Sequence, residues 1–497
     1  MEPTGNEPIR AGRELAVGSA WMIGMRWAIR SVGLLSTVIL ARLLAPDDFG
    51  VVAMAMVAVA ILQSFTQSGV DLALLRAESP QREHYDAAWT LEIIQGVGLA
   101  AVLFLSAPLV AGQLGDPRVT EVIRVLSVAA LVGGFQNIGV VNFRRELNFR
   151  REFQFGVYKK LSTFMVTIAA ALLLRNYWAL VIGQLAGRVV EVALSYLMSG
   201  FRPRLSLARV GEIWGFSKWL VLSRFSMLIN RQFDRWVVGA VGGAAAMGNY
   251  FIAQDFASSP SDEVIAPMSR AAFPVYSRLR HDPVQLADAF RRMLGSVVAI
   301  TFATGLGIAA VAEDFVHVVL GAKWVGAVPL IPWLGLFAAV YGIVRALDIF
   351  LIATGRERMS SVMALGYAFV TIPVMWLAGQ RTGVDGIAVA KAATAVVLVS
   401  ALAVAGMRTP PLTLRIFVSA VWPPMLSAAA MFAAVKMLQW LVPIESHPWG
   451  LIRDVIAGAI VYIGCGLVIW LARGRPAGIE RDFINEARRR LGRLNGP

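Results

Sequence analysis

The chain has 497 residues, of which 57% are hydrophobic and only 16% are charged, and its mean hydropathy is +0.64. A water-soluble domain cannot bury that much apolar surface, so the composition excludes an ordinary soluble protein and indicates an integral membrane protein. The formal net charge of +14 fits basic cytoplasmic connections better than a nucleic-acid footprint. The single cysteine, Cys465, excludes an internal disulfide framework, and the four histidines lack the spacing of metal ligands, so no metal or other cofactor is expected.

Fourteen apolar stretches, each of roughly twenty residues or more, could cross the hydrocarbon layer as helices. They lie near 15–42, 48–75, 87–113, 119–141, 156–174, 177–199, 213–241, 247–269, 290–312, 327–353, 360–379, 385–406, 415–441 and 451–472. Because every backbone polar group must be satisfied in lipid, these stretches predict an all-α polytopic bundle of about 14 transmembrane helices. They are too long and too continuous for the short alternating strands of a membrane β-barrel.

The connections between these spans alternate in charge. Those after odd-numbered spans hold about four basic residues, Arg118, Arg175, Lys323 and Arg381. Those after even-numbered spans, together with both termini, hold about 29 by the same count. Because basic residues mark the cytoplasmic side, the pattern predicts that both termini are cytoplasmic.

An internal repeat appears when the chain is shifted by 198 residues against itself. Four identities share this offset: Ser19 with Ser217, Trp21 with Trp219, Arg26 with Arg224, and Gly50 with Gly248. Six spans separate the copies, so the repeats are parallel and predict two lobes around a central site. The expected organisation is a cytoplasmic N-terminus (1–14), an N-lobe of spans 1–6 (15–199), a cytoplasmic linker (200–212), a C-lobe of spans 7–12 (213–406), spans 13 and 14 (415–472), and a basic amphipathic tail (473–497).

Several arginines lie inside predicted spans, where each charge costs roughly 2.5–3.5 kcal/mol and should face a cavity or a partner. Arg26 and Arg30 share one face of span 1. In span 7, Arg224, Arg231 and Arg235 follow at spacings of seven and four, on one stripe. The repeat places the two stripes at equivalent positions, so they predict a cationic cavity that suits phosphate oxygens. Alternatively, the arginines snorkel to an interface or pair locally, as Arg231 or Arg235 could with Asp234.

Carboxylates also lie within the spans. Glu92 and Asp255 have no evident partner in the sequence, and either could carry a proton. Asp348 is three residues from Arg345, and Glu191 is three residues from Arg188, so each is expected to form an ion pair with its neighbour.

The stretch "NFRRELNFRREF" (142–153) interleaves arginines with aromatics between spans 4 and 5. Its basic residues are Arg144, Arg145, Arg150 and Arg151. We interpret it as an interfacial helix with Phe in the headgroup layer and Arg on anionic lipid. Contact with an anionic lipid-linked substrate is the alternative, and nucleic acid is not expected as a partner.

No catalytic constellation and no phosphate-binding P-loop appears in the sequence, so a transporter is expected rather than an enzyme. The longest outer connection, about 313–326, is short for an enzyme that joins lipid-linked sugars.

Several stretches resemble a known family. "ARLLAPDDFGVVAMAMVAVAILQSFTQSGVDLALLR" (41–76) resembles the start of bacterial oligosaccharide/polysaccharide flippases of the Wzx type, in the multidrug/oligosaccharidyl-lipid/polysaccharide exporter superfamily. "FRRELNFRREF" (143–153) resembles the basic connection after their fourth span, and 216–253 resembles their seventh and eighth spans. The stretches 273–283 and 321–335 match later landmarks, and the resemblance extends over roughly 15–410.

The resemblance implies a flippase that moves undecaprenyl-diphosphate-linked oligosaccharide units across the bacterial inner membrane by alternating access, for O-antigen, capsule or exopolysaccharide. Relatives that flip the peptidoglycan precursor need arginines in the first span, where Arg26 and Arg30 lie. Expected partners are the lipid-linked glycan, membrane lipids, and polysaccharide polymerase or chain-length machinery. The rival interpretations are a cation-coupled drug exporter of the same superfamily, a membrane glycan polymerase or ligase, and a non-transporting scaffold of an export complex.

Overall fold

The computed structural model describes residues 7–66, 70–76, 80–208, 210–407, 412–444 and 447–474. All regular elements in these residues are helices and none of these residues forms a strand, which confirms the all-α prediction. By its internal contacts the chain divides into two compact units, unit 1 (Met1–Gly248) and unit 2 (Asn249–Pro497).

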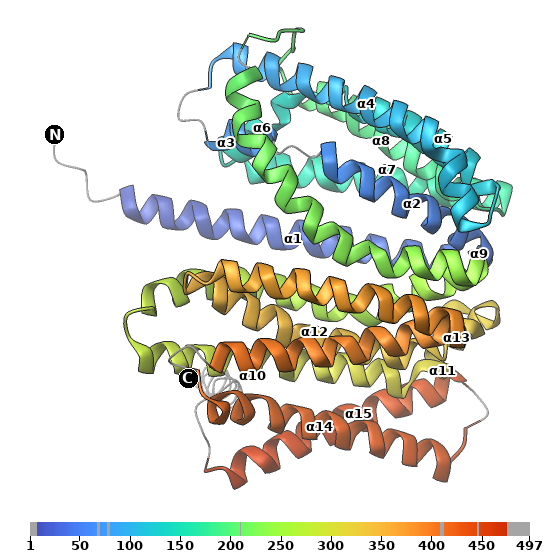
Figure 1. Cartoon of the computed structure of the whole chain (residues 1–497), viewed down its shortest axis with the longest axis vertical. Coiled ribbons are helices and arrows are strands. Elements are labelled where there is room, and N and C mark those ends of the chain that lie inside the picture. The colour runs from blue at the N-terminus through green and yellow to red at the C-terminus, as the bar shows by residue number, and fades with distance from the viewer. Residues whose placement is uncertain are drawn as a thin grey trace, which may run out of the picture. The chain divides into compact units, whose positions relative to one another are not determined.

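The helices of each unit follow in chain order (Figure 1). Unit 1 contains α1 (Glu7–Leu43), α2 (Pro46–Thr66), α3 (Val70–Arg76), α4 (Arg82–Leu114), α5 (Arg118–Gly133), η1 (Ile138–Val140), α6 (Val141–Arg145), α7 (Phe149–Leu174), α8 (Trp178–Met198) and the first part of α9 (Val210–Leu279). Unit 2 contains the rest of α9, then α10 (Pro283–Ala310), α11 (Ala312–Phe315), η2 (Val316–Leu320), η3 (Ala322–Ala327), α12 (Leu330–Ala353), α13 (Glu357–Met407), α14 (Leu414–Leu441) and α15 (His447–Ala472).

Ten of the described helices are long and apolar enough to cross a membrane, and an eleventh span results if the bent pair Arg118–Gly133 and Ile138–Arg145 counts as one. This confirms a polytopic membrane protein. Two of the ten contain a break, α9 at Gly243 and α13 at Gly383, where φ is +70° and +69°. Glycine tolerates these angles because it lacks a Cβ. The predicted boundaries between spans 7 and 8 and between spans 11 and 12 fall at these breaks, whereas the number fourteen and the cytoplasmic termini stay predictions.

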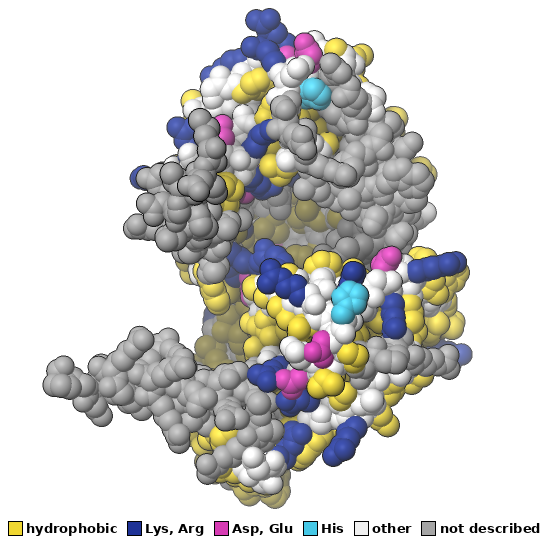
Figure 2. Space-filling view, turned by 90° about the vertical axis from the view of Figure 1, so that its left-hand side faces the viewer, with side chains coloured by type: hydrophobic (Ala, Val, Ile, Leu, Met, Phe, Trp, Pro, Cys, Tyr) yellow, Lys and Arg dark blue, Asp and Glu magenta, His cyan; other side chains and the backbone are white. Residues whose placement is uncertain are grey.

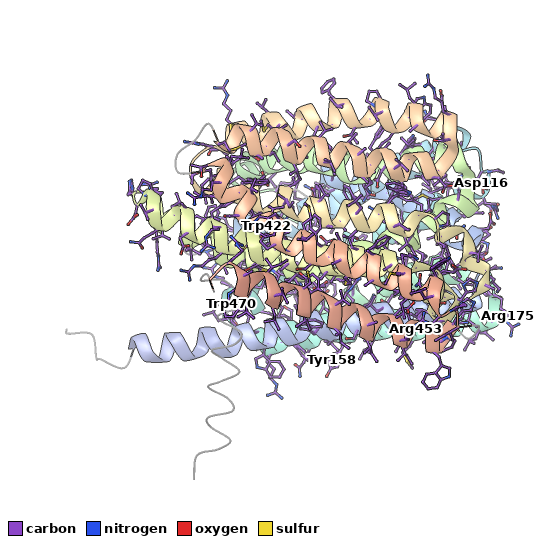
Figure 3. The ribbon with its side chains drawn as sticks, turned by 90° about the horizontal axis from the view of Figure 1, so that it is seen from below. Asp116, Tyr158, Arg175, Trp422, Arg453 and Trp470 are labelled. Carbon is purple, nitrogen blue, oxygen red and sulfur yellow. The ribbon has the colours of Figure 1, made fainter. Side chains whose placement is uncertain are left out.

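One end of unit 1 gathers the connections that follow its odd-numbered spans. The Arg118 guanidinium pairs with Asp47 at 2.5 Å, and the Tyr177 backbone N–H donates to Asp48 at 2.9 Å. Arg175 lies at this end of α7 (Figure 3). Arg118 also hydrogen-bonds Asp116 and thereby holds the pKa of that carboxyl below its usual range.

The opposite end of unit 1 gathers the basic connections. The Arg204 backbone N–H donates to Asp86 at 2.8 Å, and the Arg145 guanidinium donates to the Leu74 carbonyl at 3.2 Å. Figure 2 looks onto this end and shows Lys and Arg side chains scattered over the described surface. The two ends of unit 1 therefore separate the two kinds of connection in the way the charge alternation predicts.

Small residues let the helices of each unit approach closely. A Cβ built on Gly183 of α8 would lie 1.9 Å from the Thr167 hydroxyl of α7. A Cβ built on Gly305 of α10 would lie 2.3 Å from the Gly335 carbonyl of α12. In lipid, where burial of apolar surface contributes little to helix association, such close packing supplies the attraction between helices.

A reciprocal glycine contact joins the first turn of α2 to α9. A Cβ on Gly50 would lie 1.7 Å from the Ala244 carbonyl oxygen, and one on Gly248 would lie 1.8 Å from that of Pro46. The offset of 198 relates Pro46 to Ala244 and Gly50 to Gly248. The contact of Gly50 with Ala244 and that of Gly248 with Pro46 are therefore equivalent under the repeat. A parallel repeat would produce such a contact. The predicted lobe boundaries stay a prediction, and the start of the predicted C-lobe (213–248) packs within unit 1.

Substituting Gly50 by Ala should destabilise unit 1, because the added methyl overlaps a backbone carbonyl that cannot move alone. The expected loss is about 1–3 kcal/mol of unfolding free energy, the usual result of overpacking. The measurement is thermal unfolding of the purified protein in detergent. Gly98→Ala in α4 is the matched control, since nothing lies within 4 Å of its built Cβ. Equal melting temperatures for Gly50→Ala and Gly98→Ala would contradict the close contact.

Candidate functional site

The predicted arginines of span 1 lie on a helix that packs along α7. Arg26 and Arg30 are both half-buried on α1. The Trp21 and Phe153 rings meet edge to face with centroids 5.0 Å apart. One turn beyond Arg30, a Cβ on Gly33 would lie 3.8 Å from the amine of Lys160. The packing of α1 on α7 thus places the Lys160 amine beside the α1 backbone, one turn from Arg30.

The packing of α7 on α8 adds further basic residues. On α8, the Arg188 guanidinium pairs with Glu191 at 2.8 Å, which confirms the predicted pair. Lys159 of α7 pairs with the same carboxylate, whose side chain is 8% exposed. We call Arg26, Arg30, Lys159, Lys160 and Arg188, with Glu191, the basic cluster. Its named members carry five positive charges and one negative charge.

The second predicted arginine stripe is only partly described. The side chains of Arg224 and Arg231 lie outside the described residues. Arg235 lies on α9, with its guanidinium 3.4 Å from the Gln232 amide oxygen. Asp234, which precedes it in the sequence, is buried. A cavity with one cationic stripe from each lobe therefore stays a prediction.

The predicted carboxylates have different surroundings. Glu92 is half-buried on α4, and Asp255 of α9 accepts a hydrogen bond from the Ser259 hydroxyl at 3.2 Å. Asp348 of α12 accepts a hydrogen bond from the Ser360 hydroxyl of α13. The expected pair of Asp348 with Arg345 is wrong, because no ion pair joins them in the described structure.

The tandem basic stretch forms two helices rather than one. α6 ends at Arg145, Leu147 adopts a φ of +54°, and the Asn148 side chain caps the start of α7. Arg144 pairs with Glu152 at 2.5 Å across this turn. Arg145 holds the Leu74 carbonyl, whereas Arg150 and Arg151 are exposed, as a membrane-surface role requires. The interpretation of this stretch as a single helix is therefore wrong, because the turn at Leu147 separates α6 from α7.

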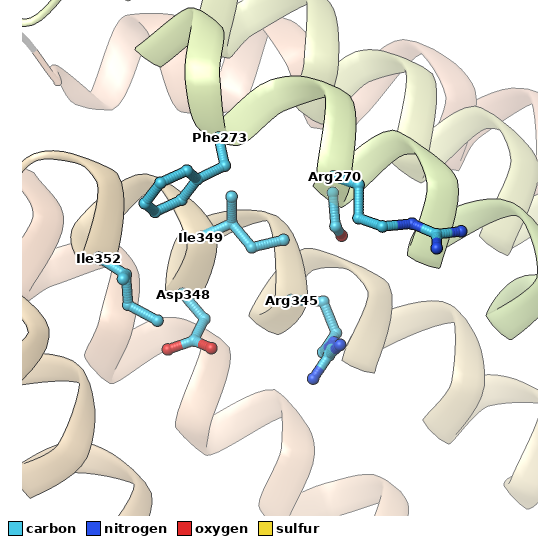
Figure 4. Close-up of a pocket in the computed structure, with 7 residues that line it drawn as sticks. Arg270, Phe273, Arg345, Asp348, Ile349 and Ile352 are labelled. Atoms are coloured by element: carbon cyan, nitrogen blue, oxygen red, sulfur yellow. The ribbon is translucent and has the colours of Figure 1, made fainter. Parts of the chain in front are cut away.

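A pocket of about 430 Å³ lies between α9 and α12, within unit 2 (Figure 4). Its polar side chains include Ser269 and Arg270 from α9 and Arg345 from α12. Neither arginine makes a hydrogen bond or ion pair with any part of the chain that the structure describes. The sequence analysis missed Arg270 because the predicted span ended at 269, and it assigned Arg345 to Asp348.

Lys391 is a further charge that the sequence analysis overlooked. It lies on α13 and is 6% exposed. Its amine donates to the Tyr250 hydroxyl at 3.1 Å and lies 4.5 Å from the centroid of the Phe337 ring. A cation over an aromatic face is stabilised by the ring quadrupole. Lys391 lies inside the apolar stretch 385–406, so it meets the same criterion, a charge within a predicted span, that identified the arginines of span 1.

The comparisons with known proteins identify the family. A family described as "Polysaccharide biosynthesis protein" matches residues 39–329, more than half of the chain, and the chain belongs to this family. The lipopolysaccharide biosynthesis protein WzxC of Escherichia coli (strain K12) is 24% identical over 378 residues, 74% of this chain and 76% of WzxC. The succinoglycan biosynthesis transport protein ExoT of Rhizobium meliloti (strain 1021) is 26% identical over 317 residues, 63% of each chain.

Solved structures share the fold. The lipid II flippase MurJ, in an inward closed conformation, superposes with a TM-score of 0.74, at 14% identity, over 91% of this chain and 99% of that one. An inward-facing MATE family multidrug resistance transporter of the MOP superfamily gives a TM-score of 0.58, at 14% identity, over 82% and 95%. At these identities the similarity concerns the fold alone. The protein is therefore a multi-pass membrane protein of the polysaccharide biosynthesis family, with a fold that it shares with both MurJ and the MATE transporter.

Substituting Glu191 by Gln should destabilise unit 1, because Lys159 and Arg188 would lose their shared carboxylate. Both cations are more than a third exposed, so we expect a moderate loss of about 1–3 kcal/mol. Thermal unfolding in detergent measures the loss. Glu146→Gln is the control, since this carboxylate is exposed and makes no side-chain hydrogen bond or ion pair within the described residues. An unchanged melting temperature for Glu191→Gln would contradict the role of Glu191 in the basic cluster.

Proposed function

We propose that the protein is a flippase that moves an undecaprenyl-diphosphate-linked oligosaccharide unit from the cytoplasmic to the outer leaflet of the bacterial inner membrane. Membership of the polysaccharide biosynthesis family and the names of the relatives support a role in polysaccharide export. The fold that the chain shares with the lipid II flippase MurJ is consistent with a lipid-linked cargo.

The observation that carries the proposal is the basic cluster, part of which lies on helices that are long and apolar enough to cross a membrane. Placing a charge in hydrocarbon costs roughly 2.5–3.5 kcal/mol on the insertion scale, so such charges are retained where they bind something. α7 and α8 are both long and apolar enough to cross the membrane, and between them they carry Lys159, Lys160 and Arg188. A diphosphate carries several negative charges, and guanidinium groups bind phosphate oxygens in pairs. The basic cluster would compensate the diphosphate while the isoprenoid chain stays in lipid.

Alternating access would move the bound unit without covalent chemistry. In this proposal Arg224, Arg231 and Arg235 complete the cationic cavity from the second lobe. Glu92, Asp234, Asp255 and Asp348 are the candidates for coupling or pairing carboxylates. Polymerase or chain-length machinery would act on the unit after translocation.

A drug exporter is the competing function, because a MATE family transporter shares the fold. A cationic cavity would repel cationic drugs and attract anions, so the basic cluster favours the flippase.

The double variant Arg26→Gln, Arg30→Gln should lower the rate of flipping by about tenfold or more, since each lost charge-assisted contact weakens phosphate binding. The measurement uses proteoliposomes with a fluorescent polyprenyl-diphosphate-linked saccharide and an impermeant quencher outside. Arg415→Gln is the control, because this arginine is exposed and unpaired among the described residues. Equal rates for the double variant and the wild type would contradict the proposed role of these arginines, and a wild type that flips nothing would contradict the function.

A further inference from the structure

The pocket of unit 2 has one cationic side. Arg270 of α9 is exposed and Arg345 of α12 is half-buried. Both line the pocket without a partner in the described chain. Ser269 also lines the pocket, and its hydroxyl is shielded from solvent and makes no hydrogen bond to the residues that the structure describes. A buried polar group without a partner costs about 1–3 kcal/mol, so this arrangement gains from a ligand with several acceptor oxygens.

The opposite side of the pocket is apolar. Figure 4 shows Phe273 and Ile352 at the end away from the two arginines. Their side chains are 45% and 40% exposed, so they can contact a chain that lies outside the pocket. The site thus offers charge at one end and an apolar surface at the other, as an amphiphilic anion requires.

The remaining charge in the lining refines this description. Asp348 accepts a hydrogen bond from Ser360 and lies on the Ile352 side of the pocket (Figure 4). It does not neutralise Arg345 by contact, and it would repel a phosphate from the apolar end. An anion is therefore directed toward Arg270 and Arg345.

The volume of about 430 Å³ is in the range of pockets that hold small ligands and is sufficient for a headgroup phosphate, whereas a long lipid chain would extend beyond it. The chain would run over Phe273 and Ile352 into the bilayer.

We propose that this pocket binds the phosphate of a membrane lipid, with Arg270, Arg345 and Ser269 on the phosphate and Phe273 and Ile352 against the start of the chain. On the predicted topology, α9 and α12 both end at the cytoplasmic side here, so the site serves the inner leaflet. Two lipids carry this chemistry, an isoprenoid diphosphate and an anionic phospholipid. The assignment to the isoprenoid diphosphate rests on the proposed function and makes the pocket a docking site for the substrate.

The test measures equilibrium binding to the full-length protein in phosphatidylcholine nanodiscs. The probes are undecaprenyl diphosphate, phosphatidylglycerol and inorganic pyrophosphate. We expect Arg270→Gln and Arg345→Gln each to weaken binding of the lipid phosphate by about tenfold or more. Arg358→Gln is the matched control, because this exposed arginine of α13 lies outside the pocket and is unpaired in the described chain. Ile349→Phe, which fills the pocket and keeps both arginines, should weaken binding to a similar extent.

Each outcome decides a separate point. Selective binding of undecaprenyl diphosphate supports the substrate as the source, and equal binding of phosphatidylglycerol supports a membrane phospholipid in the same site. Inorganic pyrophosphate binding as tightly as the lipid would overturn the role of the apolar end. Wild-type binding by both arginine variants would overturn the site. If the arginine variants bind like the wild type but the wild-type protein flips the lipid-linked saccharide in proteoliposomes, the proposed function stands without this site. If the wild-type protein binds the lipid through the two arginines but flips no lipid-linked saccharide, the site stands without the proposed function.

Discussion

The cost of placing charge in hydrocarbon is the constraint on which the arrangement of this protein depends. The chain compensates such charges in two ways within the described residues. Glu191 compensates Lys159 and Arg188 together, and an aromatic ring and a hydroxyl hold Lys391. Arg270 and Arg345 have neither kind of partner within the described residues, and they lie together at a pocket. These two charges therefore mark a place where a ligand can compensate them.

The backbone of the helices provides the frame for these charges. Gly305 brings α10 and α12 into contact at the backbone, and Gly183 of α8 lies against the Thr167 side chain of α7, so both glycines allow close packing within their unit. The Gly50 and Gly248 contact has the further property of mapping onto itself under the offset of 198. Transporters built from parallel repeats change access by moving one repeat against the other. A close contact between equivalent turns of the two repeats would have to change during such a movement.

Much of the fold could be predicted from the sequence because the signals are local. Apolar length identifies the helices, and the alternation of basic connections matches the two ends of unit 1. The pair of Arg188 with Glu191 was predicted from spacing alone and is present. The same spacing rule failed for Arg345 and Asp348, because Ser360 on the next helix reaches the carboxylate instead. The spacing of residues along one helix cannot show that a side chain of a neighbouring helix will take the partner instead.

The site was harder to predict for a related reason. Arg270 follows the last residue of a predicted span, and only the course of α9 beyond Gly243 places it beside Arg345. Lys391 can be recognised from the sequence alone, because it is a charge within an apolar stretch. The turn at Leu147 depends on a positive φ that the sequence does not indicate at a leucine, although the capping Asn148 is a residue type that favours a helix start.

The central claim is that this protein moves a lipid-linked glycan unit to the outer leaflet. The most direct measurement is the sidedness of that unit in the native host after depletion of the protein, read with an impermeant reagent that modifies the sugar from outside. The account predicts that unmodified units accumulate on the inner leaflet. Accumulation of single units that the reagent modifies would contradict it, because translocation would then proceed without this protein.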